Sequence, residues 1–351
     1  MILIDADSLT QLAELLLQAV KVPKDEAARC ARSLVDANLT GYDSHGMMRI
    51  PFYVQMIENG EIDLSAKIEV VRESPTSVVA NANWVLGQSA GFWLADQLIE
   101  KAKTSGMAIG TMYRAGHIGR LGEYCELAAA EGLVTQAMVN THGAINRVAP
   151  PGGTQPRLGT NPIAFGVPNG NAPLILDFST SATAEGKVRV KSIAGEPCPE
   201  GWLVDNQGHS TTDPNSLYAT PPGSILPFGG TQMYKGFGLG LMVDIFSGAL
   251  SGGLCSRAKA ETQKGNCVFM QMINPEHFGG AEHFASEVQG LTEFVKSCPT
   301  VSESYEITLP GDPERRVKQR KLERGIEFDD GNWAKLVDLA QRLCVPVPPT
   351  R

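Results

Sequence analysis

Residues 234–250, YKGFGLGLMVDIFSGAL, decide whether the chain carries the common dinucleotide-binding fingerprint. That fingerprint, G-x-G-x-x-G, follows the first strand of a Rossmann domain and opens its first helix. Gly236 and Gly238 match the first two glycines, but Leu241 stands where the third belongs. No G-x-G-x-x-G follows a strand elsewhere in the sequence. We therefore predict no Rossmann domain, and we expect this stretch to form a buried, glycine-rich helix.

Composition narrows the class of protein. The 351 residues include 30 Lys and Arg against 38 Asp and Glu, a net charge of −8, which disfavours nucleic-acid binding. Seven scattered cysteines without a C-x-x-C pair indicate neither a disulfide framework nor a zinc site, and we predict no metal. The N-terminus lacks the basic start of a signal peptide, and the most apolar run, interrupted by Asp244, is too short to cross a membrane. We expect a cytoplasmic protein.

Apolar periodicity and turn residues predict an α+β fold. We expect helices at 9–20 (capped by Asp7 or Ser8), 23–41, 47–58, 88–103, 122–130, 234–250, 282–296, 314–324 and 332–343. We expect strands at 68–71, 77–80, 107–113, 133–140, 163–167, 174–178 and 267–273. This order predicts two domains. Residues 1–72, with 305–351 returning to them, form a helical domain built from both termini, and residues 73–304 form a mixed α+β core.

Three histidines lie in unusual settings. His45 follows Asp43 and Ser44 in D-S-H-G, where Asp43 can orient its ring, and Arg49 one turn later can grip a carboxylate. Alternatively, Asp43 or Ser44 caps the next helix and His45 is exposed. His117 lies in A-G-H-I-G-R between a strand and a helix whose N-terminus could hold phosphate, or in an ordinary turn. His142 begins a Gly- and Pro-rich loop and could be no more than a loop residue.

Two further stretches each allow a functional and a structural interpretation. Residues 177–181, DFSTS, end an apolar strand with groups that suit a ribose or phosphate, although an Asx or Ser/Thr turn is equally compatible. The basic stretch 314–324, ERRVKQRKLER, is interpreted as a solvated helix face rather than a nucleic-acid site.

Taken in order, these segments resemble the malate/L-lactate dehydrogenase family that lacks a Rossmann fold. The resemblance runs from about Leu9 to Ala340. It rests on D-S-H-G with Arg49, G-H-I-G at 116–119, LGTNP at 158–162, LDFSTSA at 176–182, YKGFGL at 234–239 and LPG at 309–311. The segments GKVRV at 186–190 and GALSGG at 248–253 look most like the hydroxycarboxylate dehydrogenase B branch.

The resemblance implies an NAD(P)-binding core with a largely antiparallel mixed sheet, a homodimer, and reversible reduction of a 2-oxo acid to a 2-hydroxy acid. One branch of the family reduces cyclic imino acids. It implies that His45 is the proton donor and acceptor, although some members use the histidine that corresponds to His117. We expect the substrate to contact Ser44, Arg49, Thr141 and Arg147, the last of which the family pattern does not include. The cofactor, NAD or NADP, would contact His45, Gly119, Arg120, Leu121, Ile175, Leu176, Asp177, Phe178, Ser179, Tyr234, Lys235, Gly236, Asn266, Gly311, Asp312, Pro313 and Glu314.

The sequence departs from the family at 141–147, THGAINR, which is longer than usual and adds His142 and Arg147. This loop borders the site in relatives, so we expect it to control substrate choice, unless it is only a surface loop. The identity of the 2-oxo acid therefore stays open. Other classes also remain possible, namely a non-catalytic sensor of oxo or imino acids on the same fold, or a helical adaptor. The complete cofactor segments and His45 speak against both.

Overall fold

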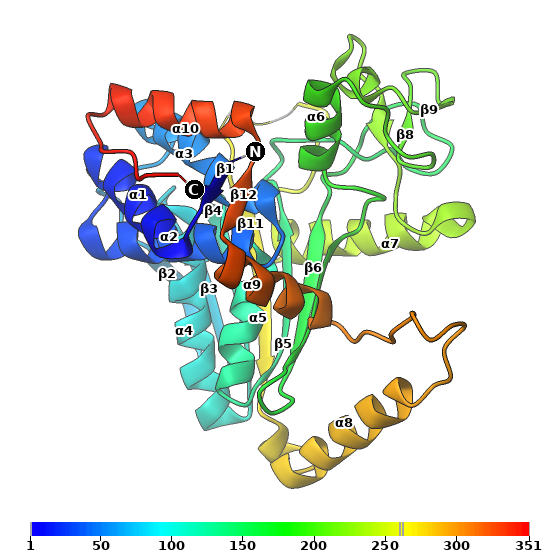
Figure 1. Ribbon diagram of the computed structural model, residues 1–351. Helices are drawn as coiled ribbons and strands as arrows, with labels where there is room; N and C mark the ends of the chain where they lie inside the picture. Colours follow the sequence, from blue (N-terminus) through cyan, green and yellow to red (C-terminus); the bar gives the residue numbers. More distant parts are fainter. Residues whose placement is uncertain (1, 260, 262, 351) are drawn as a thin grey trace.

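The computed structural model, which describes residues 2–259, 261 and 263–350, is built around a seven-stranded sheet (Figure 1). The strand order is β2-β3-β4-β11-β5-β6-β7. The strands are β2 (Glu69–Ser74), β3 (Ser77–Asn81), β4 (Met107–Ala115), β11 (Asn266–Ile273), β5 (Val134–Asn140), β6 (Pro162–Val167) and β7 (Leu174–Ser179). The β3–β4 pair is parallel and every other neighbouring pair is antiparallel. The predicted α+β class and mixed sheet are confirmed.

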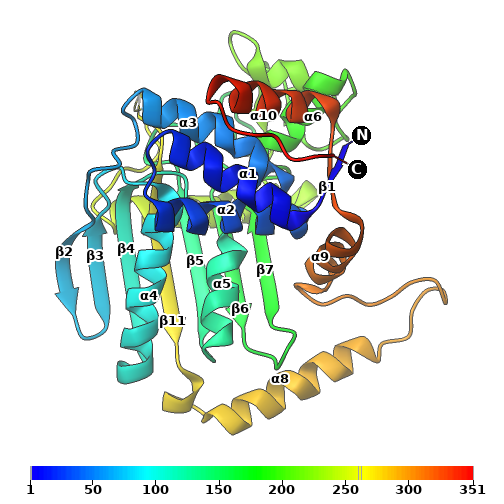
Figure 2. The same ribbon diagram turned by 60° about the vertical axis from the view of Figure 1, so that its left-hand side comes forward.

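Two helices, α4 (Gly87–Ser105) and α5 (Leu121–Ala130), cover one face of the sheet (Figure 2). Their buried side chains form one hydrophobic cluster with those of β3, β4, β5 and β11. Gly110 on β4 allows close packing, since a Cβ there would lie 2.7 Å from Leu94 Cδ1. On the other face, α7 (Met233–Asp244) packs on β5 and β6 through Val243.

The two ends of the chain share a second hydrophobic cluster. It joins α1 (Ala6–Ala19), α2 (Lys24–Leu39) and α3 (Ile50–Glu58) to α10 (Asp330–Arg342), and β1 (Ile2–Ile4) pairs with β12 (Ile326–Phe328). The starts of two helices differ from the prediction. Asp5 caps α1 by accepting from the Ser8 N–H, and α3 begins at Ile50, because two 3₁₀ turns precede it.

A smaller lobe lies beside the terminal helices at the upper end of the sheet in Figure 1. It contains α6 (Glu185–Ala194), the 3₁₀ helix η3 (Pro214–Tyr218), and a three-stranded sheet of β8 (Leu203–Val204), β9 (Ser210–Thr211) and β10 (Ser224–Ile225). Its small core also takes Val148 and Leu158 from the chain before β6. Strands of two residues carry no alternating pattern, which is why the sequence did not predict them.

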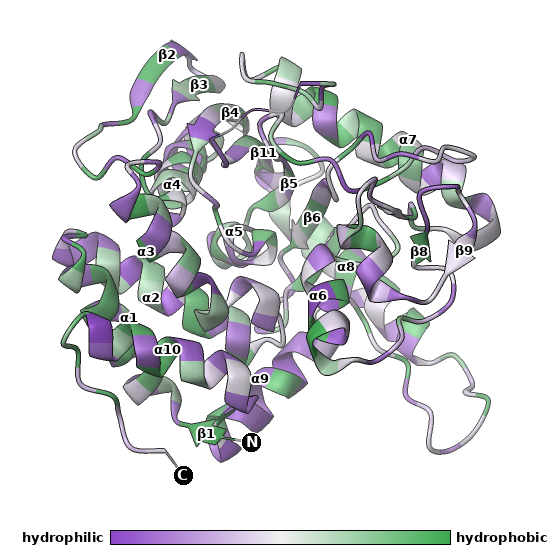
Figure 3. Cartoon of the chain, turned by 90° about the horizontal axis from the view of Figure 1, so that it is seen from above, coloured by the Kyte–Doolittle hydropathy of each residue, from purple (hydrophilic) through white to green (hydrophobic). Residues whose placement is uncertain are grey.

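Residues 234–250 are helical, as predicted, but the prediction that this helix is buried is wrong for one of its sides. The segment forms α7 and a π-helical turn, Ile245–Ala249, and one side of it is exposed at Tyr234, Leu241, Met242, Ile245, Phe246 and Leu250. Glycines explain the asymmetry. Gly240 meets Thr180 and Gly248 meets Asn140, so one side packs closely while the larger apolar side chains face outward. Figure 3 shows hydrophobic residues along α7 at the edge of the molecule.

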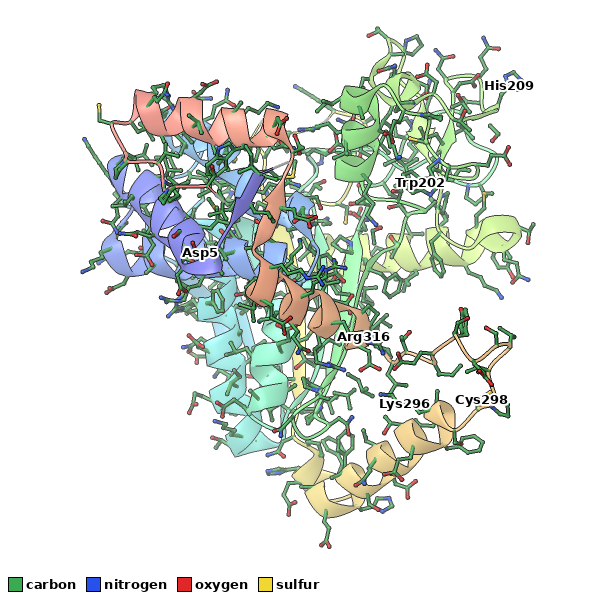
Figure 4. The ribbon with its side chains drawn as sticks, in the orientation of Figure 1. Asp5, Trp202, His209, Lys296, Cys298 and Arg316 are labelled. Atoms are coloured by element: carbon green, nitrogen blue, oxygen red, sulfur yellow. The ribbon has the colours of Figure 1, made fainter. Side chains whose placement is uncertain are left out.

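The chain after β11 leaves the body of the protein. A 3₁₀ turn (Pro275–His277) leads into α8 (Ala281–Lys296), whose only described buried residue is Thr292. Figure 4 shows Lys296 and Cys298 at the far end of α8, with Arg316 across the open space on α9 (Asp312–Arg324). Two ion pairs, Lys296–Asp312 and Glu306–Arg316, tie this arm back to α9. The predicted amphipathic helix is therefore present, with its apolar side uncovered in one chain.

Candidate functional site

The D-S-H-G segment forms two short 3₁₀ turns, Asp43–His45 and Met47–Arg49, between α2 and α3. Asn38 at the end of α2 holds this turn. Its side chain accepts from the Met47 N–H at 2.8 Å and donates to Asp43 Oδ1 at 2.6 Å. Gly46 is required beside it, because a Cβ at this position would overlap the Asn38 amide. The buried Asn38 side chain therefore holds the turn that carries His45 in place.

Asp43 does not orient the His45 ring, contrary to expectation. Its carboxylate accepts from Asn38 and from Lys321 Nζ of α9 at 3.2 Å, and Lys321 also donates to the Asn38 carbonyl at 2.7 Å. The alternative, in which Asp43 or Ser44 caps the third helix, is also wrong, since α3 has no side-chain cap and His45 is half-buried. The atom beside His45 Nδ1 is Ser44 Oγ, at 3.1 Å.

The basic segment 314–324 is only partly a solvated face. Lys321 is buried, and Lys318 pairs with Asp36 of α2 at 2.5 Å. Arg315 donates to the Pro173 carbonyl at 2.7 Å. Several of its cations therefore attach α9 to the rest of the protein, at sequence separations that no local pattern reveals.

The structure brings His45 and His117 together. Their rings stack with centroids 5.5 Å apart and planes 27° apart. His117 Nδ1 lies 2.6 Å from the Tyr53 hydroxyl. Among the residues that the structure describes, neither Nε2 atom has a hydrogen-bond partner. The two rings together present two such atoms that a ligand could engage.

Arg49 sits beside this pair. Its Nε donates to the Ser44 carbonyl at 2.6 Å, which anchors the side chain and leaves the two terminal nitrogens without a partner in the described part of the chain. A guanidinium held in this way presents a fork that matches a carboxylate.

Burial and cations keep both imidazoles neutral. Burial, with Arg49 and Arg120, lowers the pKa of His45 to about 3. Burial, Arg49 and His45 hold the pKa of His117 well below its ordinary value. At neutral pH, both rings are therefore uncharged, and each can accept a proton at one ring nitrogen.

A second group of predicted residues meets at the start of α5. Asp177 on β7 accepts from the Gly122 N–H at 2.7 Å, and burial raises the pKa of this carboxyl to about 6. The sequence left open whether this helix N-terminus could hold phosphate or follows an ordinary turn. An internal carboxyl instead occupies one of its donors, so the place for an anion is partly taken by the protein itself.

Arg120 is a buried cation among acids. Only 2% of its side chain is exposed, and it bonds to Asp36 at 2.8 Å and to both oxygens of Glu126, at 2.7 and 3.1 Å. Its guanidinium carbon lies 5.7 Å from the centre of the Tyr42 ring. Because both terminal nitrogens of Arg120 bond to acids within the protein, the main role of this side chain is to connect α2, through Asp36, to α5, through Glu126.

Contacts near Tyr42 and Asp177 connect several of the segments that were predicted to hold a cofactor. Tyr42 Oη donates to Glu314 at 3.1 Å and to the Asp177 carbonyl at 3.3 Å, so α9 and β7 meet at one phenol. The Ile175 N–H donates to the Pro310 carbonyl at 3.2 Å, beside Gly311. Tyr234 and Lys235 are exposed in the first turn of α7. Gly236 in the same turn packs on Phe228, and the Phe228 ring meets the Phe178 ring edge-on with centroids 5.9 Å apart.

Asn266 connects the His117 segment to the loop 141–147. It accepts from the Ile118 N–H at 3.0 Å and donates to the Asn140 carbonyl at 2.9 Å. Thr141 Oγ1 then donates to the Ile145 carbonyl at 3.1 Å. Arg147 is half-buried, and its Nε is a buried donor without a partner among the described residues.

His142 is a buried residue rather than an exposed loop residue. Its Nδ1 lies 3.0 Å from Cys267 Sγ, and its ring meets Trp84 edge-on at 5.4 Å. Burial and Arg114 lower its pKa to about 4. It therefore packs the base of the loop.

Sequence reasoning missed Asn38, Tyr53, Gln88 and Lys321. Each occupies a helix position with nothing unusual on either side. The partners of Tyr53, Gln88 and Lys321 lie far away in the sequence, whereas the side chain of Asn38 bonds to Asp43 and Met47 of the following turn. The only available signal was that polar residues recur on the inner faces of helices.

No group of three or more His, Cys, Asp or Glu side chains among the described residues could hold a metal ion. Nor does any helix in residues 2–259, 261 and 263–350 have the length and apolarity needed to cross a membrane.

Comparison with known proteins identifies the family. The model of the malate/L-lactate dehydrogenase family matches residues 4–337. Hydroxycarboxylate dehydrogenase B of Escherichia coli (strain K12) is 35% identical over 97% of this chain and 94% of its own length. A solved putative malate/lactate dehydrogenase from E. coli superposes with a TM-score of 0.92 at 34% identity, covering 98% of this chain and 96% of its own.

A solved Δ1-piperideine-2-carboxylate reductase from Pseudomonas syringae pv. tomato superposes with a TM-score of 0.83 at 29% identity, covering 97% of this chain and all of its own. The family match and these similarities span nearly the whole chain and include both histidine segments. The chain belongs to the malate/L-lactate dehydrogenase family.

Proposed function

We propose that the protein is an NAD(P)-dependent oxidoreductase that interconverts a 2-oxo acid and a 2-hydroxy acid. The observation that carries this proposal is the stacked pair of neutral histidines beside the anchored guanidinium of Arg49. The substrate class needs one cation for its carboxylate and one group that exchanges a proton with its oxygen. The family description and a relative's name, malate/L-lactate dehydrogenase and hydroxycarboxylate dehydrogenase B, support the same class of substrate.

In this proposal, Arg49 binds the substrate carboxylate through its two terminal nitrogens, and the Ser44 carbonyl keeps the fork in place. Binding of the carboxylate offsets the charge that holds the histidine pKa values down, so His45 takes up a proton as the oxo acid binds. A nicotinamide cofactor supplies the hydride. As the substrate oxygen gains charge, His45 gives it this proton, and in the reverse direction the neutral ring accepts it.

The residues around Tyr42 fit a dinucleotide. Asp177 and Glu314 offer carboxyl oxygens, and the Tyr42 phenol bonds to the Glu314 carboxylate and to the main-chain carbonyl of Asp177. Carboxyl and hydroxyl groups of this kind suit ribose hydroxyls. Gly119, with φ of +84°, lets the chain turn into α5 in a backbone conformation that other residues rarely adopt. These residues, with Ile175, Leu176, Phe178 and Ser179, the turn at Tyr234, Lys235 and Gly236, and Gly311, Asp312 and Pro313, would hold NAD or NADP on a sheet that has no Rossmann order.

The remaining proposals concern organisation. We propose a helical domain of residues 1–72 with 305–351 and a cofactor domain of 73–304, acting in the cytoplasm as a homodimer. The exposed apolar side of α7 and the uncovered face of α8 support a partner copy. Light scattering at micromolar concentration tests the dimer, and a monomer would contradict it.

A second candidate function is reduction of a cyclic imino acid. The specific observation is the similarity to the Δ1-piperideine-2-carboxylate reductase. Such a substrate carries the same carboxylate next to a C=N bond, so the same cation could bind it. A non-catalytic sensor on this fold would bind NADH without oxidising it.

One panel separates these functions. We would measure oxidation of NADH and of NADPH with pyruvate, oxaloacetate, other 2-oxo acids and Δ1-piperideine-2-carboxylate, in wild type and His45→Ala. We expect turnover with at least one 2-oxo acid, a loss of about 10²–10⁴ in kcat for the variant, and little change in cofactor affinity. Turnover of the imino acid alone would favour the second function. Near-normal turnover in His45→Ala, with loss in His117→Ala, would reverse the roles of the histidines.

A further inference from the structure

A chain of hydrogen bonds leads from His117 into the core of the protein. The Tyr53 hydroxyl on α3 lies 2.6 Å from His117 Nδ1, and Gln88 Nε2 on α4 donates to the same hydroxyl oxygen at 3.0 Å. Tyr53 is 1% exposed and Gln88 is fully buried. Gly87 brings α4 against this segment, because a Cβ there would overlap the His117 carbonyl. Three elements therefore meet at one imidazole edge.

The direction of these bonds determines the tautomer of His117. A phenol has a single proton, and its oxygen here already accepts from Gln88. Burial raises the pKa of Tyr53, so the phenol keeps its proton. Among the described residues, the only other partner that the structure gives this hydroxyl is His117 Nδ1, so a hydrogen on Nδ1 would leave the buried phenol proton without an acceptor. The favoured arrangement is therefore the one in which Nδ1 accepts that proton. A neutral imidazole whose Nδ1 accepts carries its hydrogen on Nε2.

His45 lacks such a constraint. The atom near its Nδ1 is the Ser44 hydroxyl, which can donate or accept by rotating about one bond. His45 can thus gain or lose a proton without leaving a buried group unpaired. Protonation of His117 at Nδ1 would instead place two donors against each other, unless the phenol gave up its bond geometry with Gln88.

We propose that Tyr53 and Gln88 are positioning residues that hold His117 as a neutral Nε2–H donor toward the substrate, and thereby leave His45 as the group that exchanges the proton. Tyr53 and Gln88 hold His117 in this way in the free protein, before any ligand binds. The division of labour between the two histidines rests on the proposed function.

The tautomer can be read directly in the free protein by nitrogen-15 NMR of the imidazole rings. The His117 signals would be assigned by their loss in His117→Asn. We expect Nε2 protonated and Nδ1 unprotonated, with no titration between about pH 5.5 and 8. A charged ring, or a hydrogen on Nδ1, would overturn the proposal whether or not any variant folds.

Tyr53→Phe removes only the hydroxyl, and Tyr124→Phe is its matched control. Tyr124 is equally buried, but its hydroxyl bonds to the Ile118 carbonyl rather than to the ring. We expect Tyr53→Phe to give mixed tautomers for His117 and the control to keep the wild-type pattern. An unchanged pattern in Tyr53→Phe would contradict the role of the phenol.

Kinetics tests the link to the reaction. We expect Tyr53→Phe to lower kcat/KM roughly 3- to 10-fold, the effect of one hydrogen bond, and to have no further effect in a His117→Asn background. An equal loss in that background would mean a merely structural role. Should no oxo acid or imino acid turn over while the tautomer is as expected, the proposed function fails, and with it the division of labour, but the positioning of His117 stands.

Discussion

Replacing Arg120 tests whether its side chain acts in stability or in cofactor binding. Arg120→Met keeps the unbranched apolar stem of the side chain and removes the charged guanidinium. The variant leaves Glu126 without its two bonds and Asp36 with Lys318 alone. Breaking a buried ion pair on one side costs about 3–5 kcal/mol. Water can reach both acids, whose side chains are 20% and 35% exposed, so we expect the lower end, about 3 kcal/mol.

That loss translates into a modest fall in melting temperature. Unfolding entropy of roughly 2.1 cal/mol/K per residue gives about 0.7 kcal/mol/K for a chain of this length, and hence a fall in Tm of about 4 °C. Differential scanning fluorimetry and denaturant titration measure it. Arg120→Met/Glu126→Gln should recover part of the loss, because one uncompensated charge is gone. The exposed pair Arg189–Glu185 provides the control, and we expect Arg189→Met to change stability by less than about 0.5 kcal/mol.

An unchanged Tm in Arg120→Met, together with a large rise in KM for the cofactor, would refute this reasoning. It would mean that the Arg120 guanidinium bonds mainly to the cofactor, and that Asp36 and Glu126 do not destabilise the fold when the guanidinium is removed. A fall in Tm with a small change in cofactor KM is the result that the geometry predicts.

Three other substitutions probe the site. Arg49→Lys replaces a fork by a point charge, and KM for the oxo acid should rise at least several-fold, about 1–3 kcal/mol; an unchanged KM in steady-state assays would assign the carboxylate to another cation. Arg147→Ala should reduce kcat/KM selectively for a dicarboxylic oxo acid compared with an apolar one, and equal losses would limit the loop 141–147 to a structural role. Gly46→Ala should lower both Tm and kcat because its Cβ overlaps the Asn38 amide, whereas Gly290→Ala on α8, where the new Cβ meets nothing within 4 Å, should not; normal turnover in Gly46→Ala would show that the D-S-H-G turn can shift freely.

Much of the fold follows from local patterns in the sequence. Apolar periodicity predicted the seven strands of the main sheet and most helices to within a few residues, because most of these elements bury one continuous face. Strand β2 and helix α8 are exceptions, since both are largely exposed. The strands β8, β9 and β10 have two residues each and no period to detect. The outward side of α7 was missed for a different reason. Its apolar residues are as hydrophobic as a core, and only the position of its glycines shows which side packs.

The candidate site divides in the same way. His45 and His117 could be singled out because each stands next to glycine in a turn, and Arg49 because it follows His45 by about one helical turn. Tyr53 and Lys321 were not, since each looks like an ordinary helix residue until the chain folds. Lys321 meets Asn38 across 283 positions of sequence, and no spacing rule reaches that far.

The central claim is that both site histidines are neutral before substrate binds, and the pH dependence of the two reaction directions tests it most directly. Reduction consumes one proton overall, so the ratio of kcat/KM for reduction to that for oxidation must fall tenfold per pH unit. With the pKa of His45 lowered to about 3 by burial and Arg49, the free site has no proton to lose between pH 6 and 8.5. We therefore predict that kcat/KM for the oxo acid falls tenfold per unit across this range, while kcat/KM for the hydroxy acid stays constant. A constant value for the oxo acid below about pH 7, with a matching decline for the hydroxy acid as the pH falls, would show a protonated histidine in the free site and contradict the account.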